Sequence, residues 1–164
     1  MRLMRAIVRS RARKTAHCAA LLFVALGFAR ADAHDDVMEL AGSMAGALTE
    51  VNGNGASVAR GNVPKFMAAF SKDMAEYDTL KNNVTALVNE GEVSSSIQPL
   101  TEEGDGQVYK IDLDWLLEVR SLEQDGPIVR RREVVHCELR KEKKHWKIVA
   151  LKPLDFFAPI QSGN

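Results

Sequence analysis

The sequence predicts an α+β fold, with three N-terminal helices packed on one face of a curved, mainly antiparallel four-stranded sheet. Apolar residues recur at spacings of three and four over residues 37–88, and then alternate with polar residues over residues 109–119 and 135–139. The first spacing lines one face of a helix and the second lines one face of a strand. Since helices come first and strands follow, we expect two segregated layers rather than alternating βα units.

The clearest strand signal begins at Tyr109. Alternate residues are apolar from there, and the residues between them are polar, with the exception of Leu116. Asp125-Gly126 is a turn signal, and a second strand is expected from about Ile128 to Lys141. The apolar positions that alternate are Tyr109, Ile111, Leu113, Trp115, Leu117 and Val119 in the first strand, and Val135, Cys137 and Leu139 in the second.

Both apolar sets have odd numbers, which restricts how the two strands pair. A slip of one residue would turn one set to the opposite face, so paired residue numbers must sum to an even value. A three-residue loop with Gly126 in a left-handed conformation meets this condition. We expect this loop to place Trp115 opposite Val135, and Asp114 opposite His136 on the outer face.

The bounds of the expected helices follow from residues that typically begin or end a helix. Asp35-Asp36 suits a helix start, Asn62 with Pro64 suits a second, and Gly91 suits the end of a third. Two adjacent phenylalanines after the last strand are expected to close an open edge of the core. The expected helices cover residues 35–52, 62–70 and 78–90, and the outer two strands cover residues 92–100 and 146–151.

Residues 1–31 are predicted to be a signal peptide, followed by a single domain over residues 32–164. A basic start precedes an apolar run from Cys18 to Phe28, which is too short to span a bilayer comfortably. Ala29-Arg30-Ala31 is a cleavage pattern of small residues, with Ala31-Asp32-Ala33 as a close alternative. A buried N-terminal helix is the competing interpretation. The order of the signals favours export, to the periplasm or the medium.

Removing the leader changes the charge of the protein. The whole chain has 22 basic and 22 acidic residues, and residues 1–31 hold seven of the basic ones. The remaining chain has a formal charge of −7, which makes nucleic acid and anionic membranes poor partners. Cys137 is then the single cysteine, so no internal disulfide is expected.

The order of elements, the second-helix sequence GNVPKFMAAFSKDM and the ending WKIVALKPLDFFAP resemble the nuclear transport factor 2-like superfamily, as an exported bacterial member. The resemblance covers about residues 35–159 and implies a cystatin-like cone with a pocket at its wide end. The functions that it implies range from those of isomerases, dehydratases and hydrolases to those of non-catalytic binding or dimerisation domains. A hairpin usual between the second and third helices is missing here, or is reduced to Ser71–Tyr77.

Four residues form the candidate ligand-binding site inside the cone: Tyr109, Trp115, Glu133 and Cys137. Glu133 is expected opposite Leu117, as the one charged side chain well inside the strands. A carboxylate in such a position would have a raised pKa and could act as a general base. The alternative is that Glu133 lies at the rim of the sheet and reaches water.

No catalytic residue, metal site or cofactor is predicted. The pair Asp114 and His136 has no nucleophile beside it, and His34-Asp35-Asp36 is weak evidence for a metal site. The sequence therefore predicts an exported, non-catalytic binding or interaction domain. It would hold a small apolar ligand in the cone, or form a homodimer through the sheet face that carries Leu116 and Val134. The alternative is a small cone enzyme that uses a buried carboxylate.

Overall fold

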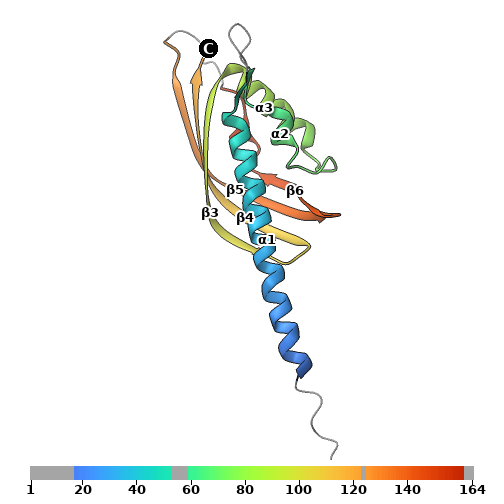
Figure 1. The fold of residues 1–164 in the computed structure, drawn as a ribbon. Coiled ribbons are helices and arrows are strands. Elements are labelled where there is room, and N and C mark those ends of the chain that lie inside the picture. Colours follow the sequence, from blue (N-terminus) through green and yellow to red (C-terminus); the bar gives the residue numbers. More distant parts are fainter. Residues whose placement is uncertain (1–16, 53–58, 123–124, 161–164) are drawn as a thin grey trace, which may run out of the picture.

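A computed structural model describes residues 17–52, 59–122 and 125–160. Three helices lie on one side of a curved sheet, and the N-terminal half of the first helix projects beyond it (Figure 1). Within the described residues no helix is both long enough and apolar enough to cross a membrane. The elements are α1 (His17–Thr49), β1 (Val51–Asn52), β2 (Ala59–Arg60), α2 (Val63–Met67), α3 (Tyr77–Glu90), β3 (Gly91–Gly104), β4 (Val108–Ser121), β5 (Ile128–Glu142), β6 (His145–Lys152) and the 3-10 helix η1 (Asp155–Phe157).

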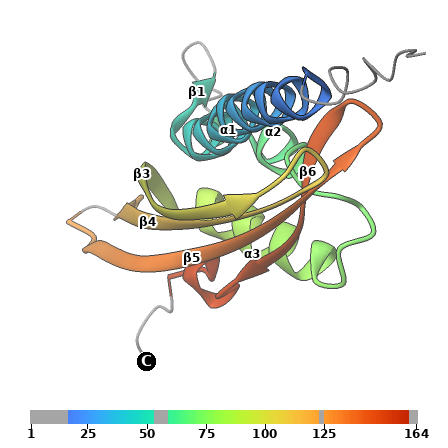
Figure 2. The same ribbon diagram turned by 90° about the horizontal axis from the view of Figure 1, so that it is seen from below.

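The main sheet has the strand order β3-β4-β5-β6, and every neighbouring pair is antiparallel. The view from below shows α1 lying against β3 and near the β5–β6 hairpin (Figure 2). A separate two-stranded ribbon, β1 with β2, follows α1. The expected α+β layout, with helices on one face of a four-stranded antiparallel sheet, is confirmed.

The core forms where the sequence alternates. All six odd-numbered side chains from Tyr109 to Val119 are buried, and so are Val135, Cys137 and Leu139. The helices supply the other half of this core, chiefly from α1 and α3. The helix residues are Ala33, Val37, Ala41, Met44, Ala45, Ala47 and Leu48 from α1, and Leu80, Val84, Leu87 and Val88 from α3.

α1 begins at His17 in the full chain, so the expected helix start at Asp35-Asp36 is wrong for this form. No proline interrupts the sequence between the apolar run and Asp35, and a helix propagates readily through such a segment once it has begun. The basic start of the leader, residues 2–14, lies outside the described residues, as does Gly53. Whether the leader is removed stays a prediction.

α2 starts as its sequence indicates but is short. The Asn62 side chain accepts a hydrogen bond from the Lys65 N–H at 3.0 Å, and Pro64 lies in the first turn. Gly61 has φ +67, and a Cβ there would lie 2.5 Å from Val88 Cγ1, so only glycine fits this approach. Its N–H donates to the Glu50 carbonyl at 2.7 Å, which fixes the end of α1 beside α2.

The segment between α2 and α3 contains turns in place of a hairpin, as expected for Ser71–Tyr77. It is attached to the edge of the sheet. Ser71 N–H donates to the Ile148 carbonyl, and Ile148 N–H donates to the Ala69 carbonyl, both at 2.9 Å. These bonds occupy part of the free edge of β6, which would otherwise be open to pairing.

The pairing of β4 with β5 differs from the prediction by two residues. Trp115 pairs with Glu133 rather than Val135, and His136 pairs with Asp112 rather than Asp114. The left-handed residue of the turn is Asp125, with φ 61, rather than Gly126. Because the shift is an even number, every side chain keeps its predicted face.

Charge explains why the observed register is favoured. The predicted pairing set Asp112 against Glu138, and like charges opposite one another destabilise a sheet. In the structure Asp112 meets His136, and Lys110 meets Glu138 instead. Glu118 likewise meets Arg130, so each of these pairs joins opposite charges or shares a proton.

Candidate functional site

The four predicted site residues do not form one site. Tyr109, Trp115 and Cys137 are buried on the inner face as expected, but Glu133 is exposed. Tyr109 and Trp115 are six residues apart on one strand, which separates them by about 20 Å. Tyr109 packs against Trp146, with ring centroids 5.9 Å apart. The predicted ligand pocket is therefore divided between two parts of a continuous core.

Glu133 lies on the predicted face but at its open end. β6 pairs with β5 only from His136 to Glu142, so the first half of β5 has no strand beyond it. Glu133 pairs with Trp115 rather than with Leu117. Glu133 is exposed, so the alternative given above, that it lies at the rim of the sheet and reaches water, is the one that the structure shows.

Side chains fill the interior of the cone. A space between α1 and the inner face of the sheet has a volume of about 10 Å³, and Cys137 is one of its lining residues. Such a space holds at most about one water molecule. Burial raises the pKa of the Cys137 thiol to about 12, so the thiol stays protonated and is a poor nucleophile. Among the described residues, Ser71 is the only buried side chain of the polar or charged class.

The C-terminal tail completes the core above Trp115. The Phe157 ring packs edge-on against the rings of Trp115 and Phe156, with centroid distances of 5.1 and 5.0 Å. Arg131, the residue on the inner face of β5 nearest the tail, donates to the carbonyl oxygens of Phe156 and Pro159 at 3.1 and 3.0 Å, and to that of Ala158. The expected role of the two phenylalanines, closing an open edge of the core, is confirmed.

A polar cluster at the rim joins His34, Glu102 and Tyr109. The Tyr109 hydroxyl donates to Glu102 Oε2 at 2.8 Å, and His34 Nδ1 lies 2.7 Å from the same oxygen. Sequence reasoning missed this cluster because it ended the expected strand at residue 100. In fact β3 continues to Gly104, with a shift in register between Pro99 and Thr101.

That shift carries Glu102 to the inner face. Before it, paired numbers of β3 and β4 sum to 212, as in Ile97 with Trp115; after it they sum to 213, as in Glu102 with Ile111. An inserted residue of this kind exchanges the two faces of a strand. Pro99, which cannot donate to the sheet, was the available signal for such an irregularity.

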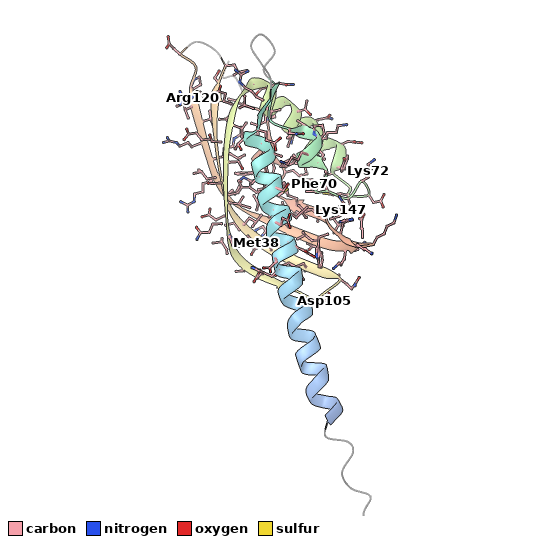
Figure 3. All side chains as sticks on the ribbon, viewed as in Figure 1. Met38, Phe70, Lys72, Asp105, Arg120 and Lys147 are labelled. Carbon is pink, nitrogen blue, oxygen red and sulfur yellow. The ribbon has the colours of Figure 1, made fainter. Side chains whose placement is uncertain are left out.

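An open groove of about 610 Å³ lies beside α2, between the α2–α3 segment and β6. Figure 3 shows Lys72, Phe70 and Lys147 on this side of the molecule. Lys72, Lys81 and Lys147 face Asp73 and Glu142 across the groove, which leaves a small positive excess. The Lys147 ammonium already donates to the Ala68 carbonyl. The groove is exposed to solvent, and its charges are nearly balanced.

In the middle of the outer face of the sheet, β4 carries three acids and β5 carries the groups that pair with them. Toward the Val108 end of the same face the order reverses, because Lys110 of β4 pairs with Glu138 of β5. Asp114 Oδ2 lies 2.6 Å from Arg132 Nη2, Glu118 Oε2 lies 2.7 Å from Arg130 Nε, and Asp112 Oδ1 lies 2.7 Å from His136 Nδ1. The outer face thus presents an acidic stripe (Asp112, Asp114, Glu118) beside a basic stripe (Arg130, Arg132, His136).

Hydrogen bonds stabilise the charged form of two of these acids. A bond from Thr101 Oγ1 at 2.7 Å and a contact with His136 hold the pKa of Asp112 below its usual value. Bonds from Arg132 hold the pKa of Asp114 below its usual value as well. Both carboxyls therefore remain ionised at any pH near neutral.

Two apolar side chains lie between the stripes. Leu116 and Val134 are 38% and 37% exposed, and both point away from the core. Leu116 pairs with Arg132, and Val134 pairs with Asp114, so the two apolar residues are diagonal neighbours on adjacent strands. They form a small apolar centre bordered by charge, which is the general arrangement of a protein–protein interface.

No family model and no curated protein sequence matches the chain. Solved structures do. A hexachlorocyclohexane dehydrochlorinase (LinA) type 2 is similar with a TM-score of 0.58 at 14% identity, over 76% of this chain and 86% of that one. A protein of unknown function with a cystatin-like fold from Nostoc punctiforme is similar with a TM-score of 0.50 at 16% identity, over 71% and 85%. A function-unknown protein from Mycobacterium tuberculosis is similar with a TM-score of 0.54 at 9% identity, over 84% and 75%.

These similarities define the class of fold, an α+β cone of the cystatin-like kind. The resemblance drawn from the sequence is confirmed at the level of the fold, which the chain shares with these structures. One of these neighbours is an enzyme and others have no known function, so the shared fold leaves the activity of this chain undetermined. The described residues contain no group of three or more His, Cys, Asp or Glu side chains placed to hold a metal ion.

Proposed function

We propose that the protein is an exported, non-catalytic interaction domain that pairs with a second copy of itself through the outer face of its sheet. The arrangement of the acidic and basic stripes on neighbouring strands carries this proposal. The filled interior supports it as well, because a bound ligand or an enclosed catalytic carboxylate would need space inside the cone.

The interior offers little to a ligand or a reaction. A small apolar ligand would have to displace side chains from around a space of about 10 Å³. The alternative function, a cone enzyme with a buried carboxylate, needs an acid inside the cone. Glu133 is exposed, and none of the described buried side chains is a carboxylate. We therefore favour a function at the surface.

The outer face is complementary to itself. In a two-fold dimer each residue meets its partner through the same patch, so the patch must match its own rotated copy. A rotation about an axis between β4 and β5 places the acidic stripe of one copy over the basic stripe of the other. Leu116 and Val134, near the axis, would then meet their counterparts and exclude water.

The face is large enough for such an interface. Three strands at about 4.8 Å spacing give a width of roughly 14 Å over a length of about 45 Å, and the eight-residue β6 adds a fourth strand of about 26 Å. The resulting area of roughly 770 Å² is close to the approximately 800 Å² per partner of a standard interface. Curvature of the sheet reduces the part that touches, which suggests a modest affinity.

Export is supported by the order of signals at the N-terminus, where a basic start, an apolar run and a small-residue cleavage pattern follow one another. The domain left behind carries a formal charge of −7. The proposal places it in the periplasm or the medium, without nucleic acid or membrane as a partner.

Sedimentation velocity on the chain 32–164 over a range of concentrations tests the pairing. We expect a reversible monomer–dimer equilibrium in the wild type. Leu116→Glu faces Arg132 and Val134→Lys faces Asp114, so each new charge is tolerated in the monomer but is repelled or desolvated in the dimer. Either substitution should weaken dimerisation at least tenfold, which corresponds to about 1.4 kcal/mol.

Val51→Glu is the matched control, because Val51 is also an exposed apolar strand residue but lies on the separate ribbon. It should leave the equilibrium unchanged. A wild-type chain that is monomeric at all concentrations would overturn the proposed pairing, and so would a dimer that both outer-face variants retain. Mass measurement of the protein recovered outside the cytoplasm tests export separately.

A further inference from the structure

The N-terminus that cleavage after Ala31 creates reads Asp32-Ala33-His34. We propose that the mature protein binds one Cu²⁺ ion through these three residues. The donors are the terminal amine of Asp32, the backbone nitrogens of Ala33 and His34, and the imidazole Nδ1 of His34. This inference rests on the export step of the proposed function and does not depend on dimerisation.

The chelate is possible because His34 would be the third residue of the mature chain. From the terminal amine to the amide nitrogen of Ala33, and from there to that of His34, each step closes a five-membered ring with the metal. The step from the His34 amide nitrogen to its own Nδ1 closes a six-membered ring. Four nitrogens then lie in one plane, which is the geometry that Cu²⁺ and Ni²⁺ prefer, and Cu²⁺ binds more tightly of the two.

Proline at the second or third position would abolish the site, and neither Ala33 nor His34 is proline. Binding requires both amide nitrogens to lose their protons and the amine and imidazole to be unprotonated. Protons are therefore released as the metal binds, so affinity rises with pH.

In the full chain the two amides are not available. Residues 32–34 lie within α1, where the N–H of each residue bonds to the carbonyl four residues earlier. For Ala33 and His34 those carbonyls belong to Ala29 and Arg30, which cleavage after Ala31 removes. The two N–H groups then belong to the first turn of a shorter helix, where no helical acceptor remains. Cleavage thus supplies the free amine and releases the amides in one step.

The His34 side chain is accessible at this point. It is 42% exposed, and Nδ1 lies 2.7 Å from Glu102 Oε2. Copper must displace this contact, which is an exposed and therefore weak one. The planar chelate also requires the first turn to unwind, moving the methyl group of Ala33 from the margin of the core. The rest of α1, from Val37 onward, keeps its packing against the sheet.

The test uses the chain 32–164, released from a fusion so that Asp32 carries the free amine. It is titrated with copper sulfate in the presence of glycine as a competing chelator. We expect one equivalent of Cu²⁺ to bind, with the visible absorption and the paramagnetic resonance spectrum of a planar four-nitrogen site. The same chain with Ala31 retained is the sharpest control, because it moves His34 to the fourth position without altering the domain.

Both the Ala31-extended chain and His34→Ala should lose the four-nitrogen spectrum and bind at least a hundredfold more weakly than the chain 32–164. His145→Ala should bind like the wild type, because this exposed histidine lies in the β5–β6 hairpin. Circular dichroism checks that each variant is folded. Binding by the extended chain or by His34→Ala that equals that of the wild type would overturn the proposal, and so would failure of the wild type to compete with glycine.

The natural N-terminus separates the two proposals. If the exported protein begins at Asp32 and does not bind copper, export stands and the copper site is refuted. If it begins at His34, export stands but the native protein lacks the chelate, because the histidine is then the first residue. If the chain is not cleaved, both export and the copper site are refuted.

Discussion

Replacement of Phe157 by alanine tests whether the C-terminal tail is part of the core. Phe157 is fully buried, and its ring contacts Trp115, Phe156 and Phe66 at centroid distances of 5.1, 5.0 and 5.6 Å. Truncation of a buried phenylalanine to alanine costs about 3–5 kcal/mol through lost burial and the cavity left behind. The short η1 segment that carries Phe157 can collapse in part, so we expect a cost near the lower limit, about 3 kcal/mol.

The assay is urea unfolding of the chain 32–164, followed by the fluorescence of the two buried tryptophans, Trp115 and Trp146. A loss of about 3 kcal/mol should lower the melting temperature of a domain of this size by roughly 10–15 °C. Phe157→Leu is the matched control. It keeps most of the volume, so it should cost only about 1–1.5 kcal/mol.

A cost below about 1 kcal/mol for Phe157→Ala, with an unchanged urea dependence, would show that the tail does not pack on Trp115. A reduced urea dependence would have a different meaning, because it reports less surface exposed on unfolding. It would indicate that the tail had already detached in the native state of the variant.

Three further predictions concern single groups. The Cys137 thiol is buried and its pKa is raised to about 12, so at pH 8 it should react with iodoacetamide no faster than the protein unfolds. In urea the same thiol should react rapidly. Fast reaction in the native protein would contradict the buried position of Cys137. Asp112 has its pKa lowered from 3.8, so its contribution to stability is present above that pH and is lost as pH falls through the folded value. Asp112→Asn should therefore lower the urea midpoint at pH 7 and make it less sensitive to acid below pH 3.8, and an unchanged acid dependence would argue against the hydrogen bonds from Thr101 and His136. Tyr109→Phe removes the hydroxyl that donates to Glu102 and should cost about 0.5–1.5 kcal/mol in urea unfolding, whereas a cost like that of truncating the ring would show that the backbone had moved.

Local pattern determines the layers of this protein. Alternation from Tyr109 to Val119 specifies which side chains face the helices, because successive strand residues point to opposite sides. The Asn62 cap and the spacing of apolar residues in α3 specify two helices in the same way. Each of these features depends on residues close together in the sequence, and each was predicted correctly in kind.

Contacts between distant residues decided what the sequence alone left open. The β4–β5 register depends on which charges meet across two strands, and an error of two residues leaves every face unchanged. The inner position of Glu102 depends on an irregularity beside Pro99 that has no fixed sequence signal. Glu133 has the alternation of a core residue but is exposed, because β6 pairs with β5 only from His136 onward and leaves this part of β5 at the edge of the sheet. The sequence by itself determined the fold class and the two faces of the sheet; only the tertiary structure decided that the cone is filled and that its polar groups lie outside, because filling a volume depends on side chains from all parts of the chain at once.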